Sequence, residues 1–173
     1  MNLTTAVARS AFCLAVARIN LPHIQMEKAD GLDTEAFEKL LSKQTAFLRG
    51  ELKSRDNLAR FYEAFEVWRD ARPEDDSLAW RISELSCAAL YASIESLFDE
   101  ECDDTALILN NIGDLYDEMD ALGADTSGLR GYWADICQEF EAEFAEVRQL
   151  PLAKRYFQWL SEMDVSLFGV SND

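Results

Sequence analysis

The sequence predicts an all-α fold: a single-domain bundle of about seven or eight helices around a buried central helix, residues 78–98. This segment, LAWRISELSCAALYASIESLF, has only Ser86 and Ser93 as polar residues between Leu85 and Ile94. A helix that is apolar on all sides is typical of a buried position. Seven glycines and three prolines are few for 173 residues, which favours long helices. Elsewhere apolar residues recur at helical spacing, and no alternating run is long enough to require a strand.

The central segment has the length of a membrane span, so its charges decide between bilayer and protein core. Arg81 and Glu84 lie in its first turns and Glu95 lies near its end, which favours the core of a folded domain. An apolar content of 49% and an aromatic content of 11% indicate a packed globule. The length predicts one domain over residues 1–173, with the last few residues loose.

The N-terminal region and the cysteines bear on the compartment. Residues 11–17, AFCLAVA, resemble the apolar core of a signal peptide, but Arg18 and Asn20 follow without a cleavage context, so a first helix is expected. None of the four cysteines belongs to a C-x-x-C pair, and all lie in apolar helical patterns: Cys13, Cys87, Cys102 and Cys137. The sequence therefore predicts reduced, buried thiols and a cytoplasmic location.

Four helices are expected before the central segment, over about residues 3–20, 22–31, 34–50 and 56–71. Pro22 ends the first pattern and could itself open the second helix. Asp33 or Thr34 caps the third helix, and Gly50 either breaks or only bends it. Pro73 stops the fourth. Three residues are candidate caps for the central helix: Asp75, Asp76 and Ser77.

Three helices are expected after the central segment. Residues 104–122 carry a clean i, i+4, i+7 apolar series, and residues 129–149 carry a second apolar face. The loop between them, GADTSG at residues 123–128, is short, so the two helices should be antiparallel neighbours. Pro151 is expected to start a last helix that extends to Met163.

The net charge of −17 is the outstanding feature of the composition, and it is unevenly distributed. Residues 99–146 contain 15 acidic residues and one basic residue, Arg130, so this window carries 14 of the 17 excess negative charges. Nucleic acid and membranes are excluded as partners, because anionic surfaces would repel such a chain.

Within this window the acids follow the helical period and lie opposite the apolar faces. Acids at i, i+4 spacing repel each other by a few tenths of a kcal/mol per pair, and here they recur without nearby Lys or Arg in the sequence. We interpret them as a docking surface for a cationic partner, while a merely solvated face remains the alternative. The predicted partner-binding residues are Asp103, Asp104, Asp114, Asp117, Glu118, Asp135, Glu139, Glu143 and Glu146.

Metal and catalytic sites find little support. Residues 99–104, DEECDD, could hold a cation weakly, but no calcium-loop pattern is present. The single histidine, His23, has Asn20 three residues before it, which excludes the Glu-x-x-His pairs of a di-iron bundle. His23 follows Pro22 and is expected at the surface of a helix start. No G-x-S-x-G, glycine-rich phosphate loop or H-E-x-x-H motif occurs. No metal, cofactor or catalytic residue is predicted.

Two stretches resemble a known family. Residues 12–22, FCLAVARINLP, resemble the opening helix of the small uncharacterised bacterial family typified by the YjaG protein (domain of unknown function 416). Residues 86–90, SCAAL, are similar to the Ala-Cys-x-Ala-Leu of that family's core helix, and the order of elements agrees across most of the chain. Phe47 is nearest to a tryptophan of the family's third helix, and Leu85 replaces its aspartate before Ala-Cys. The resemblance implies an α-helical single domain and no established activity.

The sequence therefore predicts a small acidic helical interaction protein that binds and masks a basic protein partner. An immunity or inhibitor protein acts in this way on a cationic toxin or nuclease, with electrostatic attraction raising the association rate. The alternative is a cytoplasmic housekeeping or regulatory helical protein, including an enzyme whose site the sequence does not reveal.

Overall fold

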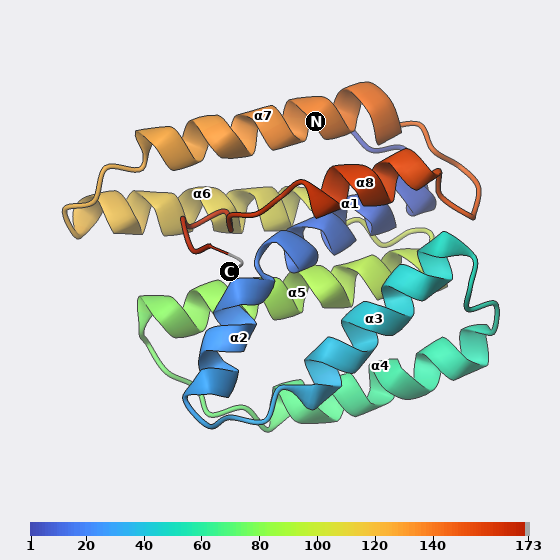
Figure 1. Cartoon of the computed structure of the whole chain (residues 1–173), viewed down its shortest axis with the longest axis horizontal. Helices are drawn as coiled ribbons and strands as arrows, with labels where there is room; N and C mark the ends of the chain where they lie inside the picture. The colour runs from blue at the N-terminus through green and yellow to red at the C-terminus, as the bar shows by residue number, and fades with distance from the viewer. Residues whose placement is uncertain (172–173) are drawn as a thin grey trace.

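The computed structural model describes residues 1–171, and within this range the protein consists of helices joined by short loops (Figure 1). Strands are absent from these residues, apart from one isolated antiparallel bridge between Val165 and Ser171. The predicted all-α fold is therefore confirmed. The helices are α1 (Ala6–Ile19), α2 (Leu21–Ala29), α3 (Glu35–Arg49), α4 (Arg55–Asp70), α5 (Leu78–Phe98), α6 (Thr105–Ala121), α7 (Ser127–Phe144) and α8 (Lys154–Ser161).

The core is built on a pair of helices, α1 and α5. Helix α5 begins and ends at the expected residues, and of the three candidate caps Ser77 accepts the hydrogen bond from the Trp80 amide, at 3.1 Å. Twelve of its 21 residues are buried, but α1 is buried more completely, with eleven of fourteen. The sequence pattern did not indicate this second central helix. Small residues on both helices, such as Ala11 and Ala92, allow their backbones to approach closely.

The other helices form two groups around this pair. In Figure 1, α3 and α4 lie side by side below α5, with α2 crossing at one end. Helices α6 and α7 run antiparallel above it, and α8 lies beside α1. None of the helices in residues 1–171 combines the length and the apolar character needed to cross a bilayer.

A buried polar cluster fixes how α1, α3 and α5 pack. The Ser10 hydroxyl donates to the Ser93 carbonyl at 2.7 Å, and the Ser93 hydroxyl donates back to the Ser10 carbonyl at 2.9 Å. The Gln44 amide lies 3.0 Å from both hydroxyls. All three side chains are fully buried. Because each hydroxyl must find its partner in the dry interior, these bonds select one register of the three helices.

Gly50, with φ +82°, ends α3, which is one of the two outcomes expected for it. The predicted boundaries of the last two helices are wrong. Helix α7 ends at Phe144 instead of residue 149, and α8 begins at Lys154 instead of Pro151. The chain between them lies at one end of the bundle and is held by bonds from the Thr5 hydroxyl to the Val147 carbonyl and from the Leu152 amide to the Leu48 carbonyl. Pro151 also disfavours helical backbone at Leu150, the residue before it, which helps to keep this stretch out of both helices.

The segment after α8 packs against α2 and α6. Leu167 and Phe168 are buried, the Leu167 amide donates to Asn20, and the Tyr116 hydroxyl donates to the Leu167 carbonyl at 2.7 Å. The expectation of a loose C-terminus falls on the last few residues. Of these, residues 172–173 lie outside the described part of the chain, whereas the segment immediately before them is anchored to the core.

Candidate functional site

Six of the nine predicted acidic residues lie on α6 and α7, whose apolar faces are buried, whereas Asp103 and Asp104 precede α6 and Glu146 follows α7. Ile112 and Leu115 of α6 and Ile136 and Phe140 of α7 point into the core. The acids of these helices therefore lie on their flanks and outer faces. Of the nine predicted residues, Asp104 and Glu118 are half-buried, and seven are exposed: Asp103, Asp114, Asp117, Asp135, Glu139, Glu143 and Glu146.

On α6, the acids near the C-terminus of the helix have basic partners. Arg130 lies 2.7 Å from Asp117 and 2.9 Å from Asp120, and Arg81 of α5 pairs with Glu118. The Thr126 hydroxyl, together with Arg130, lowers the pKa of the Asp120 carboxyl. A helix C-terminus is a poor place for negative charge, and here these pairs compensate for it.

On α7, the compensation is much weaker. Glu139 accepts a hydrogen bond from the Trp159 indole at 2.8 Å, and Glu143 lies 3.2 Å from Arg155. Both members of the Glu143–Arg155 pair are more than half exposed, so the pair contributes little. The last turn of α7 contains no basic residue. Acids near this helix end therefore remain largely unneutralised.

Among residues 1–171, several acids have no Lys or Arg within 4 Å: Asp104, Asp114, Asp135, Glu141 and Glu146. Glu141 was not among the predicted site residues, but it lines a shallow hollow with Glu143, Glu146 and Asn2 at the end of α7. Asp103 has a local role, since its carboxylate accepts the Thr105 amide at 3.1 Å.

The acidic residues of α6 and those of α7 do not all face the same way. Asp114 and Glu118 lie on the side of α6 that faces α5, where Asp114 borders a groove with Arg81 and Leu85. Glu139 and Glu143 lie on the side of α7 that faces α8. We define the α7 acidic face as the exposed acids from the middle of α7 to just after its end: Asp135, Glu139, Glu141, Glu143 and Glu146.

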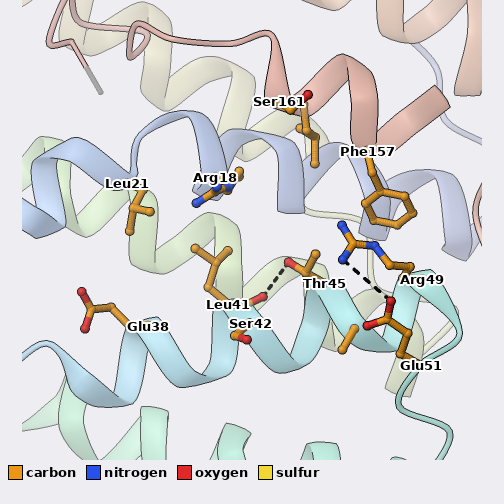
Figure 2. Close-up of a pocket in the computed structure, with 12 residues that line it drawn as sticks. Arg18, Leu21, Glu38, Leu41, Ser42, Thr45, Arg49, Glu51, Phe157 and Ser161 are labelled. Atoms are coloured by element: carbon orange, nitrogen blue, oxygen red, sulfur yellow. Dashed lines mark hydrogen bonds and ion pairs between the residues drawn. The ribbon is translucent and has the colours of Figure 1, made fainter. Parts of the chain in front are cut away.

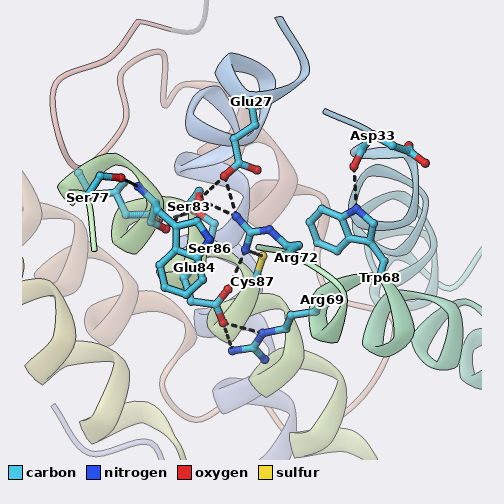
Figure 3. A network of polar contacts seen from close by, with 12 residues as sticks. Glu27, Asp33, Trp68, Arg69, Arg72, Ser77, Ser83, Glu84, Ser86 and Cys87 are labelled. Atoms are coloured by element: carbon cyan, nitrogen blue, oxygen red, sulfur yellow. Dashed lines mark hydrogen bonds and ion pairs between the residues drawn. The ribbon is translucent and has the colours of Figure 1, made fainter. Parts of the chain in front are cut away.

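A second polar site, centred on Arg72, joins α2, α4 and α5 (Figure 3). The Arg72 guanidinium lies 2.6 Å from Glu27 and 2.7 Å from Glu84, and it donates to Ser83 at 2.8 Å. Its side chain is only 7% exposed. Burial raises the pKa of the neighbouring Cys87 thiol to about 12, although Arg72 acts in the opposite direction. Arg72 is already bonded within the fold, so we interpret this site as structural.

The sequence pattern does not indicate the Arg72 site, because its members are far apart in the chain. Glu27 precedes Arg72 by 45 residues, and Glu84 follows it by 12. In sequence they are ordinary charged residues: Glu27 and Glu84 belong to separate helices, and Arg72 follows the end of a third. The only available signal was the position of Arg72 directly before Pro73, where a helix has ended and the side chain can turn inward.

His23 is buried, so the prediction that it lies at the surface is wrong. It is 8% exposed and packs edge-to-face against Phe168, with ring centroids 5.7 Å apart. Its Nε2 lies 2.9 Å from the Ser166 hydroxyl. This Ser–His pair is unsuited to nucleophilic catalysis, because the Ser166 oxygen is fully buried and accepts the backbone amides of Phe168 and Val170.

The burial of His23 predicts a pH-dependent stability. Desolvation lowers the pKa of the ring from 6.5 to about 4 in the folded protein. Between these values the unfolded chain binds a proton that the folded protein does not, so stability is full above pH 6.5 and falls as the pH drops towards 4. The loss amounts to at most about 3 kcal/mol.

Urea unfolding of the native protein and of His23→Gln at pH 7.5 and pH 4.5 measures this effect. Glutamine can still bond Ser166 but does not titrate, so the variant should lose less stability than the native protein over this interval. Equal losses in the two proteins would assign the pH dependence to the many carboxylates instead.

Residues 1–171 contain no group of three or more His, Cys, Asp or Glu side chains placed to hold a metal ion, and residues 99–104 are included in that range. All four cysteines are free thiols; Cys13 and Cys87 are buried, and Cys102 and Cys137 are partly exposed. Comparison of the chain with family models, curated proteins and solved structures finds no match. The resemblance to the YjaG-like family stays a prediction.

Proposed function

We propose that the protein is an interaction module that binds a basic protein partner through the α7 acidic face. The observation that carries the proposal is the contrast between two neighbouring helices. Acids near the end of α6 are neutralised by Arg81 and Arg130, whereas the acids of α7 are left mainly to solvent. A face that served only solubility would not need its charge concentrated at the helix end where it is least favourable.

The kind of partner follows from this charge. Exposed carboxylates at helical spacing attract Lys and Arg side chains and raise the association rate of a cationic protein, while they repel acidic ones. Masking a basic toxin or nuclease, as an immunity or inhibitor protein does, is one role that such a surface fits. The bundle around α1 and α5 would supply a rigid platform for it.

The test uses charge reversal at acids without partners. Asp135→Lys, Glu141→Lys and Glu146→Lys together change the charge of the α7 acidic face by about six units and break no ion pair. A matched control carries Glu63→Lys, Glu66→Lys and Asp70→Lys on α4, where three exposed acids also have no basic partner within 4 Å among residues 1–171. Both variants have the same net charge, so only the position of the change differs.

A basic partner recovered with the native protein is purified, and its affinity is measured at about 50 mM and 500 mM salt, where exposed charges are screened to different extents. We expect the α7 variant to bind at least about tenfold more weakly at low salt and the α4 variant to bind nearly as the native protein does. High salt should reduce native affinity towards that of the α7 variant. Equal weakening of both variants, retained affinity in the α7 variant, or recovery of no basic partner would each refute the proposal.

A further inference from the structure

A groove separate from the acidic face runs between α3 and α8 and reaches the junction of α1 and α2 (Figure 2). Its volume is about 430 Å³, within the range of small-molecule sites. A second hollow shares Arg49, Phe157 and Ser161 with it and continues past Pro151. The ends of α3 and α8 are held together here, because the Leu152 amide donates to the Leu48 carbonyl at 2.8 Å.

Two arginines and two glutamates line the groove, and one of the arginines has no partner in the described part of the chain. Arg18 is exposed, and among residues 1–171 its guanidinium has no carboxylate within 4 Å and no hydrogen bond. Glu38 also lines the groove but pairs with Lys28, at 3.3 Å. Arg49 lies 3.9 Å from Glu51, and this distance is the longest among the ion pairs of residues 1–171. One positive charge, that of Arg18, is therefore left without a counter-charge.

Arg49 is held in place by an aromatic contact. Its guanidinium carbon lies 4.5 Å from the centroid of the Phe157 ring, close enough for a favourable cation–π interaction. This stacking holds the flat face of the guanidinium while leaving N–H donors at its edge. Figure 2 shows Arg18 and Arg49 on opposite sides of Thr45, above α3.

The other residues that line the groove are mainly apolar, and one of them has a hydroxyl group that is free to donate a hydrogen bond. Leu41, Leu160 and Phe157 form an apolar wall. The Thr45 hydroxyl donates to the Leu41 carbonyl at 2.7 Å, so its proton is already used. Ser42 has no hydrogen-bond partner among residues 1–171, and its hydroxyl can donate to a ligand. An apolar wall beside unpaired donors suits a molecule with an anionic head and an apolar body.

We propose that this groove binds a small amphipathic carboxylate, with the carboxylate at Arg18 and the apolar body along Phe157 and Leu160. The planar guanidinium matches a carboxylate through two parallel hydrogen bonds. A single unpaired arginine balances one negative charge, which favours a monocarboxylate over a phosphate dianion. The excess negative charge of residues 99–146 disfavours such an anion on that part of the surface.

Decanoate is the probe for this site, and decan-1-ol is its uncharged counterpart. Binding is followed by amide chemical shifts in NMR titrations of the native protein, Arg18→Gln and Arg60→Gln. Arg60 is an exposed α4 residue without a partner in the described chain, so both variants lose one positive charge and only Arg18 lines the groove. Unchanged spectra elsewhere establish that each variant is folded.

We expect decanoate to bind the native protein saturably, with the largest shifts in α3 and α8. Arg18→Gln should weaken binding about tenfold or more, as expected for loss of a charge-assisted pair, and Arg60→Gln should leave it unchanged. Decan-1-ol should bind at least about tenfold more weakly than decanoate for the same reason. Absence of saturable decanoate binding up to about 10 mM, equal binding of the alcohol, or full affinity in Arg18→Gln would overturn the proposal.

Discussion

Leu90→Asp is expected to abolish the cooperative unfolding transition of the domain. Leu90 lies in the middle of α5 and is completely buried. A carboxylate at this position would have no basic partner and little water around it, which costs several kcal/mol. A domain of this kind has a total stability of about 5–15 kcal/mol, so the variant should be largely unfolded. Circular dichroism during thermal and urea denaturation measures the effect.

Two further variants make the result specific to burial. Ala79→Asp places the same charge on an exposed position in the first turn of α5, where it should change stability by no more than about 0.5 kcal/mol. Leu90→Ala should leave a folded protein that is about 2–5 kcal/mol less stable. A Leu90→Asp protein with native helicity and a sharp melting transition would show that the core lies elsewhere.

The central helix could be predicted closely because its signals are local. Its apolar character extends around the whole helix, and Ser77 gives it a defined start. The more complete burial of α1 was less visible, since Arg9, Ser10 and Arg18 interrupt its apolar pattern. The structure accommodates Arg9 by bonding it to the carbonyls of Leu3 and Glu100, and Ser10 by pairing it with α5. Such bonds depend on contacts between distant segments.

The acidic residues could likewise be predicted only in part, because the pattern within one helix does not reveal its contacts with other helices. Helical periodicity predicts that Asp114 and Glu139 avoid the core, and both are exposed. It does not predict which acids are neutralised, because Arg81 and Arg155 come from other helices. The burial of His23 depends on the chain end 143 residues later. The short loop at residues 123–128 likewise predicts that α6 and α7 are neighbours, but it does not determine which way the acids of each helix face.

Arg72→Met is expected to be the most destabilising substitution of a charged residue in the described chain. The side chain of methionine can fill much of the space, but it leaves Glu27 without its basic partner and Glu84 with only Arg69. Loss of one member of a buried ion pair costs about 3–5 kcal/mol. For a chain of this length, a loss of 3 kcal/mol corresponds to a decrease in Tm of about 6–12 °C.

A double-mutant cycle with Glu27→Gln separates the ion pair from packing. Glu27→Gln removes the carboxylate that Arg72→Met would leave unpaired, so the double variant should be more stable than the sum of the two single losses predicts. The same Arg→Met change at Arg60, an exposed position on α4, controls for the substitution itself and should alter stability by no more than about 0.5 kcal/mol. If Arg72→Met melts within about 2 °C of the native protein, Arg72 does not hold α2, α4 and α5 together. Its position between Trp68 and Trp80, with the guanidinium carbon 5.1 and 5.6 Å from the two ring centroids, would then have to be explained by packing alone.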